Sequence, residues 1–175
     1  MKKALVAIAA LFVSLSAFAQ GQVVFNTHDT SVAPPIDARV LNPDGTPATA
    51  GFGELVIVGA GGALTPLTTG APGAFKTSAN GAGYINAGAA TAPAGFAGGT
   101  SVQIILRAWQ GAAGSTFDTA AVKGQSTPIT VVLREAPTPP DGLTGLSGFT
   151  MTPEPTTLAL GALGLGALTL YRRRK

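Results

Sequence analysis

The sequence predicts a mainly β fold: a small antiparallel β-sandwich, for which an immunoglobulin-like arrangement is one candidate, between an N-terminal signal helix and a C-terminal transmembrane helix. Three observations support this prediction. Residues 20–152 contain short apolar and β-branched runs separated by turn residues, as in sandwiches built from short strands. The same region has no apolar stripe of helical period and helical length. Each end of the chain carries an apolar segment accompanied by cations.

The first nineteen residues have the three parts of a secretory signal. A basic start precedes an apolar run over residues 4–15, and Ala17 and Ala19 then give the small-x-small pattern of a cleavage site. We therefore expect signal peptidase to remove residues 1–19, so that Gln20 begins the mature chain. A short buried or anchoring helix is the alternative for this segment.

Turn sequences divide the region after the signal into expected strands. Asn42-Pro43-Asp44-Gly45 and Asn80-Gly81 are typical of tight turns between strands. The runs between the turns have the alternation or the β-branched content of strands. The expected strands are 23–25, 36–41, 54–58, 84–85, 101–110 and 129–134.

The run 101–110 is the clearest strand, because its apolar residues alternate along most of its length. The face expected to point into the core carries Val102, Ile104, Leu106 and Ala108. The opposite face carries Gln103, Ile105, Arg107 and Trp109. The run 129–134 repeats this logic, with Ile129, Val131 and Leu133 inward and Thr130 and Arg134 outward.

The composition divides the chain into four parts after these assignments. Residues 1–19 are the signal peptide, and residues 20–135 are a β-rich ectodomain. The Gly/Ala/Pro-rich stretch 71–99 inside the ectodomain is expected to hold a mobile loop. Residues 136–152 read as a Pro/Gly-rich linker or stalk, in which 143–149 is either a last short strand or part of the stalk. Residues 153–175 form the C-terminal segment.

The net charge of +3 belongs to the two ends of the chain. Residues 21–152 contain five Lys or Arg and seven Asp or Glu, which gives −2 for this region. Nucleic-acid binding requires cations clustered on one surface, and these five are scattered along the sequence. We therefore expect no nucleic-acid partner.

The C-terminal segment has three consecutive parts: Pro153-Glu154-Pro155, an uncharged apolar run over 156–171, and Arg172-Arg173-Arg174-Lys175. As a helix the apolar run would be about 24 Å long, short of the roughly 30 Å hydrocarbon core. Flanking arginine side chains can reach the headgroups, so a spanning helix is still expected. The four cations should stay in the cytoplasm as a stop-transfer signal. Residues 20–155 then lie outside the cytoplasmic membrane.

The two prolines of Pro153-Glu154-Pro155 favour an extended backbone, because proline fixes its own φ and disfavours helix at the residue before it. An extended segment beside the membrane is the form that a protease cleft accepts. We therefore expect this motif to be processed. A rigid spacer before an ordinary membrane anchor is the alternative.

These three parts, in this order and together with a signal peptide, resemble the PEP-CTERM sorting signal of exported bacterial proteins over residues 153–175. The resemblance implies processing by exosortase, a membrane-embedded cysteine transpeptidase. The ectodomain, with Gly21–Asn26 after the signal and Leu143-Thr144-Gly145-Leu146 before the motif, looks like small PEP-CTERM proteins of Verrucomicrobia-type genomes.

Few residues could perform chemistry. The chain has one histidine, His28, and no cysteine, which leaves it without the usual zinc ligand set or a thiol nucleophile. The G-x-S-x-G pattern of a hydrolase nucleophile is absent. We expect no catalytic residue, no cofactor and no metal site.

One pair of residues suggests a binding role. Trp109 and Arg107 share a face of the strand 101–110, where an exposed indole could stack on a sugar ring. A tryptophan buried in the core is the alternative.

The sequence therefore predicts a non-enzymatic exported protein of the cell envelope or extracellular matrix, anchored transiently in the cytoplasmic membrane and then processed. The exopolysaccharide is a candidate partner. A carbohydrate-binding or adhesive surface module is the alternative function.

Overall fold

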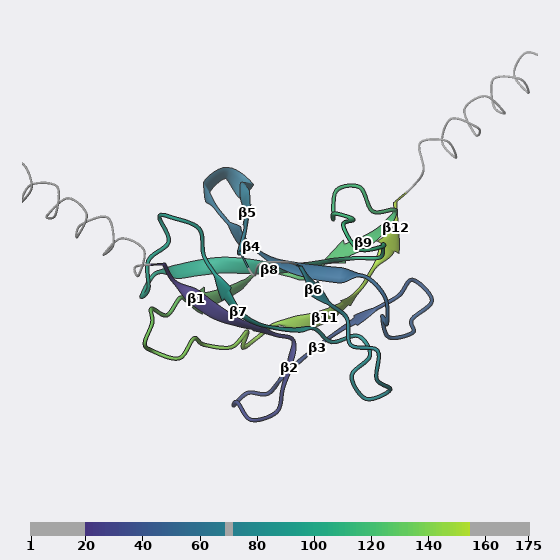
Figure 1. Cartoon of the computed structure of the whole chain (residues 1–175), viewed down its shortest axis with the longest axis horizontal. Coiled ribbons are helices and arrows are strands. Elements are labelled where there is room, and N and C mark those ends of the chain that lie inside the picture. Colours follow the sequence, from purple (N-terminus) through teal and green to yellow (C-terminus); the bar gives the residue numbers. More distant parts are fainter. Residues whose placement is uncertain (1–19, 69–71, 155–175) are drawn as a thin grey trace, which may run out of the picture.

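The structure, a computed structural model, describes residues 20–68 and 72–154 and is mainly β. Its strands form a seven-stranded, a three-stranded and a two-stranded sheet (Figure 1). Within the described residues, no helix has the length and hydropathy needed to cross a membrane. The expected signal peptide 1–19 and membrane helix 156–171 lie outside the described residues.

The seven-stranded sheet is antiparallel throughout and has the order β12-β9-β8-β4-β5, with β10 also paired to β8 and β6 to β4. Its centre is the pair of longest strands, whose seven registered residue pairs run from Phe52↔Trp109 to Val58↔Gln103. The strands of this sheet are β4 (Phe52–Val58), β5 (Leu64–Pro66), β6 (Gly73–Ala74), β8 (Ser101–Trp109), β9 (Val122–Gln125), β10 (Ile129–Val132) and β12 (Thr152–Pro153).

The two smaller sheets combine strands from the first, middle and last parts of the domain. The two-stranded sheet pairs β1 (Gln22–Asn26) with β7 (Asn86–Thr91) in antiparallel register. In the three-stranded sheet, β3 (Ile36–Leu41) lies between β2 (His28–Asp29) and β11 (Ser147–Thr150), and β11 runs parallel to β3. A single 3₁₀ turn, η1 (Ala60–Gly62), connects β4 to β5.

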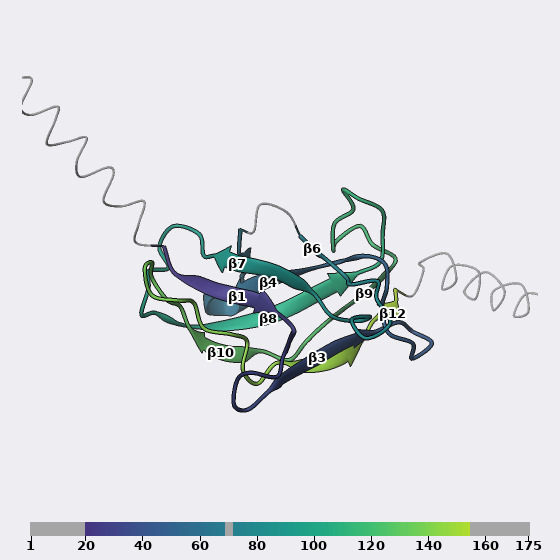
Figure 2. The same ribbon diagram turned by 60° about the horizontal axis from the view of Figure 1, so that its bottom comes forward.

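All three sheets contribute to one hydrophobic core. Fully buried residues such as Phe25 of β1, Val40 of β3 and Ile104 of β8 belong to the same cluster. In Figures 1 and 2 the strands β4 and β8 run across the middle of the molecule, with β1 and β7 near them and β3 further to one side. Figure 1 shows β11 next to β3, with which it pairs. These observations confirm the mainly β class with several antiparallel sheets, whereas the immunoglobulin-like arrangement stays a prediction.

The inward face predicted for the strand 101–110 is confirmed: its residues are at most 7% exposed. They are Val102, Ile104, Leu106 and Ala108. The inward residues predicted for 129–134 are buried as well, namely Ile129, Val131 and Leu133. Alternation predicts these inward faces because they pack on the shared core. The opposite face of β8 is also buried, at Ile105, Arg107 and Trp109.

The prediction that residues 136–152 form a linker or stalk is wrong. Leu143, Leu146 and Met151 are at most 5% exposed and belong to the core cluster. The backbone is also engaged, since the Val24 N–H donates to the Asp141 carbonyl oxygen at 2.8 Å. Burial of these three apolar side chains stabilises the segment against the domain, and the prolines at 137, 139 and 140 all precede them in the sequence. A last short strand does occur, as β11 (Ser147–Thr150), but it begins four residues later than the strand expected over 143–149.

The Gly/Ala-rich stretch 71–99 contains paired structure rather than only a loop, because β6 and β7 lie in it. Its small residues serve close packing. A Cβ placed on Gly73 would lie 2.5 Å from Ile85 Cγ2 and 3.2 Å from Phe25 Cε1. Glycine at position 73 therefore lets β6 pack closer to Ile85 and Phe25 than a residue with a Cβ could.

Candidate functional site

The Pro-Glu-Pro motif begins within β12, the last strand of the described residues. Strand β12 lies at one edge of the seven-stranded sheet, where Thr152 is registered with Lys123 and Pro153 with Val122 of β9. The Glu154 N–H donates to the Ala121 carbonyl oxygen at 2.8 Å. The first two motif residues are thus held in extended form against the domain.

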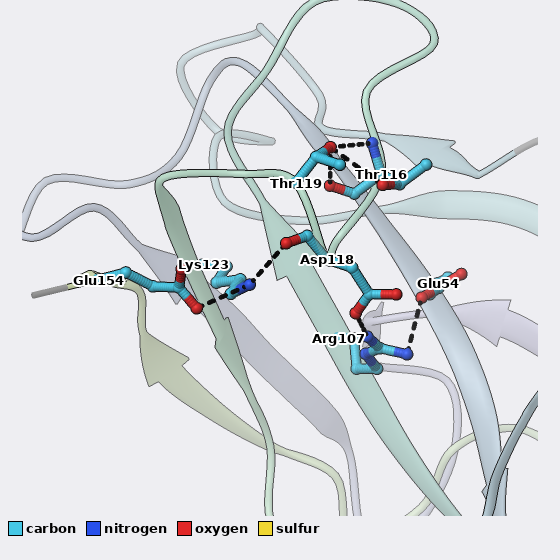
Figure 3. A network of polar contacts seen from close by, with 7 residues as sticks. All are labelled: Glu54, Arg107, Thr116, Asp118, Thr119, Lys123 and Glu154. Atoms are coloured by element: carbon cyan, nitrogen blue, oxygen red, sulfur yellow. Dashed lines mark hydrogen bonds and ion pairs between the residues drawn. The ribbon is translucent and has the colours of Figure 1, made fainter. Parts of the chain in front are cut away.

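The Glu154 side chain is fixed by an ion pair across the two strands. Its Oε1 lies 2.8 Å from Lys123 Nζ (Figure 3). The ammonium also donates to the Asp118 carbonyl oxygen at 3.2 Å and lies 5.1 Å from the centroid of the Phe117 ring. The Lys123 side chain is only 14% exposed, whereas that of Glu154 is 57% exposed. The Lys123 side chain is therefore mostly covered by the domain, whereas much of the Glu154 side chain is open to solvent.

A second cation, Arg107, contacts the same loop as Lys123, namely residues 110–121 between β8 and β9. Its Nη2 lies 2.9 Å from Asp118 Oδ1, and its Nη1 lies 3.4 Å from Glu54 Oε1 (Figure 3). The guanidinium carbon lies 3.8 Å from the centroid of the Phe117 ring. Burial raises the pKa of the Glu54 carboxyl above its ordinary value, and the Arg107 charge opposes this shift. Because Arg107 as a whole is only 9% exposed, these partners offset the cost of removing its charge from water.

The loop between β8 and β9 joins these two cations. The Thr116 N–H donates to Thr119 Oγ1 at 3.4 Å, and that hydroxyl donates to the Thr116 carbonyl oxygen at 3.2 Å. In this turn the Asp118 side chain pairs with Arg107, and the Asp118 carbonyl accepts from Lys123 (Figure 3). The Phe117 ring of the same turn contacts both cations. A continuous set of contacts therefore runs from Arg107 on the central strand to Glu154 in the motif.

The prediction that Trp109 and Arg107 present an exposed sugar-binding face is wrong. Trp109 is 1% exposed, and its Nε1 donates to Ser115 Oγ at 3.1 Å. The Phe117 ring packs edge-on against the indole, with centroids 6.3 Å apart. The loop after β8 covers this face of the strand, which alternation within the strand could not reveal. Arg107 is committed to its carboxylate partners.

A second polar cluster lies on the outward face of the three-stranded sheet. The Tyr84 hydroxyl donates to Asp37 Oδ1, and burial, together with this hydrogen bond, raises the pKa of the tyrosine. The Arg39 guanidinium carbon lies 4.7 Å from the Tyr84 ring centroid, and the His28 ring centroid lies 4.4 Å from it. Among the described residues, Arg39 Nε is buried without a hydrogen-bond partner.

This second cluster borders a cavity of about 470 Å³. The lining residues are Asp37, Arg39, Leu41, Tyr84, Gly148, Phe149 and Thr150. His28, the one histidine of the sequence, lies beside this cluster with its Nδ1 3.9 Å from Asp37 Oδ1. No group of three His, Cys, Asp or Glu side chains that could hold a metal ion occurs within residues 20–68 and 72–154.

The other sequence-predicted site residues are only partly within the described region. Gln20, the expected first residue of the mature chain, makes a β-bridge with Ala97. The remaining ones lie outside the described residues: Ala17, Ala19, Pro155, Arg172, Arg173, Arg174 and Lys175. The roles of these residues in cleavage, sorting and stop transfer stay predictions.

Comparison with protein families supplies one match. Residues 152–175 match the family described as PEP-CTERM protein-sorting motif. The match begins at Thr152, the first residue of β12, and it confirms the resemblance stated from the sequence. Comparisons with curated proteins and with solved structures find no match to the chain.

Proposed function

We propose that this chain, a PEP-CTERM protein by its motif at residues 152–175, is a non-enzymatic exported protein of the cell envelope or extracellular matrix. Its C-terminal segment anchors it transiently in the cytoplasmic membrane, and an exosortase-type transpeptidase then processes it at the motif. The observation that carries the proposal is the motif match. The motif is a sorting signal rather than a catalytic domain.

The chemistry of the segments supports a defined order of events. The signal peptide starts translocation, and the cationic tail then arrests it, because Arg and Lys are costly to move through the hydrocarbon core. The domain therefore folds outside the cytoplasm, with Thr152 and Pro153 already extended at its edge. Cleavage at the motif would separate this domain from its anchor and release it to the envelope or to the exopolysaccharide.

Export is tested by substitution at the expected signal cleavage site. Ala19→Arg should leave the precursor uncleaved, because signal peptidase accepts only small side chains at that position. The control Ala19→Gly should be cleaved normally. N-terminal sequencing of protein isolated from cells should find Gln20 first in the wild type. Wild-type protein that begins at Met1 would contradict export through this signal.

Carbohydrate binding is a second candidate function, favoured by the cavity beside Asp37, Arg39 and Tyr84 rather than by Trp109. A volume of about 470 Å³ is in the range of small-molecule sites, which join apolar walls to a few converging polar groups. Here a guanidinium and a carboxylate could bond to sugar hydroxyls or to a sugar carboxylate, and Phe149 provides an apolar wall.

This second function predicts that the mature protein binds acidic polysaccharide through Arg39. Arg39→Gln should weaken binding at least tenfold, because it removes the charge that faces the cavity. Arg134→Gln, which removes a surface cation paired with Asp141 elsewhere, should bind like the wild type. Polysaccharide pull-down or calorimetry measures the difference. Equal binding by all three proteins would exclude this cavity as the site.

A further inference from the structure

We propose that the folded domain masks its own sorting motif, so that β12 must leave β9 before the transpeptidase can cut. The ion pair between Lys123 and Glu154 fastens the masked state. This inference rests on the proposed function, and it adds a control that the domain itself exerts over processing.

The first support is the engagement of the motif backbone. Proteins that bind an extended peptide commonly hydrogen-bond its main chain and take its side chains into pockets. In this structure β9 already pairs with one edge of β12 at Thr152 and Pro153, and the Glu154 N–H already donates to the Ala121 carbonyl oxygen. An enzyme that grips the motif from this edge competes directly with β9.

The second support is the side chain of Glu154. Its carboxylate is the one charge of the Pro-Glu-Pro motif, and it is paired at 2.8 Å with Lys123. The lysine is held in place by the Asp118 carbonyl and by Phe117, which Arg107 contacts in turn. The domain thus provides Lys123 as a preformed partner for the Glu154 carboxylate. A transpeptidase pocket that recognises this carboxylate must first displace Lys123.

The third support is that the contact can open without unfolding the domain. The residue before β12, Met151, is fully buried, and its N–H donates to the Leu41 carbonyl oxygen at 2.9 Å. Beyond it, two registered residues, one further backbone bond and one ion pair hold the described part of the motif. Short edge strands with so few contacts open at low free-energy cost, so Met151 is the point where release stops.

Processing of the full chain in cells that contain exosortase tests the proposal. Lys123→Ala should be processed about two- to fivefold faster than the wild type in a pulse–chase experiment, the range expected when a part-exposed ion pair is removed. Lys123→Arg keeps the charge and should be processed at the wild-type rate. Arg134→Ala removes an ion pair of similar length elsewhere, 2.9 Å to Asp141, and should also leave the rate unchanged. A slower or unchanged rate for Lys123→Ala would overturn the proposal.

A crosslink provides an independent test that does not depend on the strength of the ion pair. The chain has no cysteine, so Lys123→Cys with Thr152→Cys introduces a single candidate disulfide between residues registered across β9 and β12. The oxidised protein should resist processing, and reduction should restore it to at least the wild-type rate. Processing of the oxidised form at the wild-type rate would disprove masking.

These results separate the inference from the function on which it rests. If wild-type protein is not processed at all, the proposed function fails. Amide exchange of the purified protein still tests the docked state in that case. Exchange at Glu154 should rise in Lys123→Ala while exchange at Met151 stays slow. Equal exchange at Glu154 in both proteins would show that Lys123 does not hold the motif.

Discussion

Replacing Ile104 with Asp should unfold the domain. Ile104 is fully buried on β8 and is registered with Ile57 of β4 on one side and Ile129 of β10 on the other. A carboxylate at this position would lose its hydration and find only apolar neighbours. We expect a loss of about 4 kcal/mol or more, which is most of the stability of an ordinary small domain.

Circular dichroism and thermal melting of the mature protein measure this effect. Gln103→Asp is the matched control, because Gln103 is on the same strand and its side chain is exposed. The control should keep the β spectrum and melt within a few degrees of the wild type. A stable, β-rich Ile104→Asp protein would contradict the shared core described for the three sheets.

Replacing Pro153 and Pro155 with Ala should abolish processing while leaving the protein inserted in the membrane. The change touches no residue of the apolar run 156–171 and none of the four terminal cations. It removes two fixed φ angles, and helix then becomes accessible to the residues before them. We expect uncut protein to accumulate in the cytoplasmic membrane.

The control for this variant is Pro139→Ala with Pro140→Ala, which makes the same chemical change outside the motif. The control should be processed and released like the wild type. Immunoblotting of membrane and released fractions measures both proteins. Normal release of the Pro153/Pro155 variant would mean that the motif is only a spacer before an ordinary anchor.

Much of the core could be predicted from the sequence, because apolar residues at every second position mark the buried face of a strand. The inward face of β8 and both faces of β10 agree with the prediction for this reason, whereas the opposite face of β8 is buried as well. The burial of Trp109 is the alternative given for this residue, but the strand alone could not decide it, because it depends on a loop that folds back over the strand. Its cover, Phe117, comes from a polar, glycine-containing segment with no periodicity.

The segment 136–152 illustrates a second limit of the sequence. Its prolines and glycines indicate a linker, but the parallel pairing of β11 with β3 joins residues more than a hundred positions apart. Local composition carries no information on such pairing. The widely spaced apolar residues Leu143, Leu146 and Met151 were the available signal, because a true stalk has no need of them.

The candidate site likewise has one part that the sequence could predict and one part that it could not. The Pro-Glu-Pro motif and its membrane segment could be recognised because their function depends on the order of local features. The docking of the motif on β9 could not, because β9 itself was not among the expected strands. Its sequence, Val-Lys-Gly-Gln, has one bulky apolar residue and a glycine, which is too little apolar content for a pattern to identify.

The most direct test of the account is the intact mass of the protein in each cell fraction, with and without exosortase. With the enzyme, the account predicts a released species that begins at Gln20 and ends within or next to Pro153-Glu154-Pro155. Without the enzyme, it predicts a membrane-bound species that begins at Gln20 and retains Arg172 to Lys175. A released species that still carries the terminal cations, or an identical mass with and without the enzyme, would contradict the account.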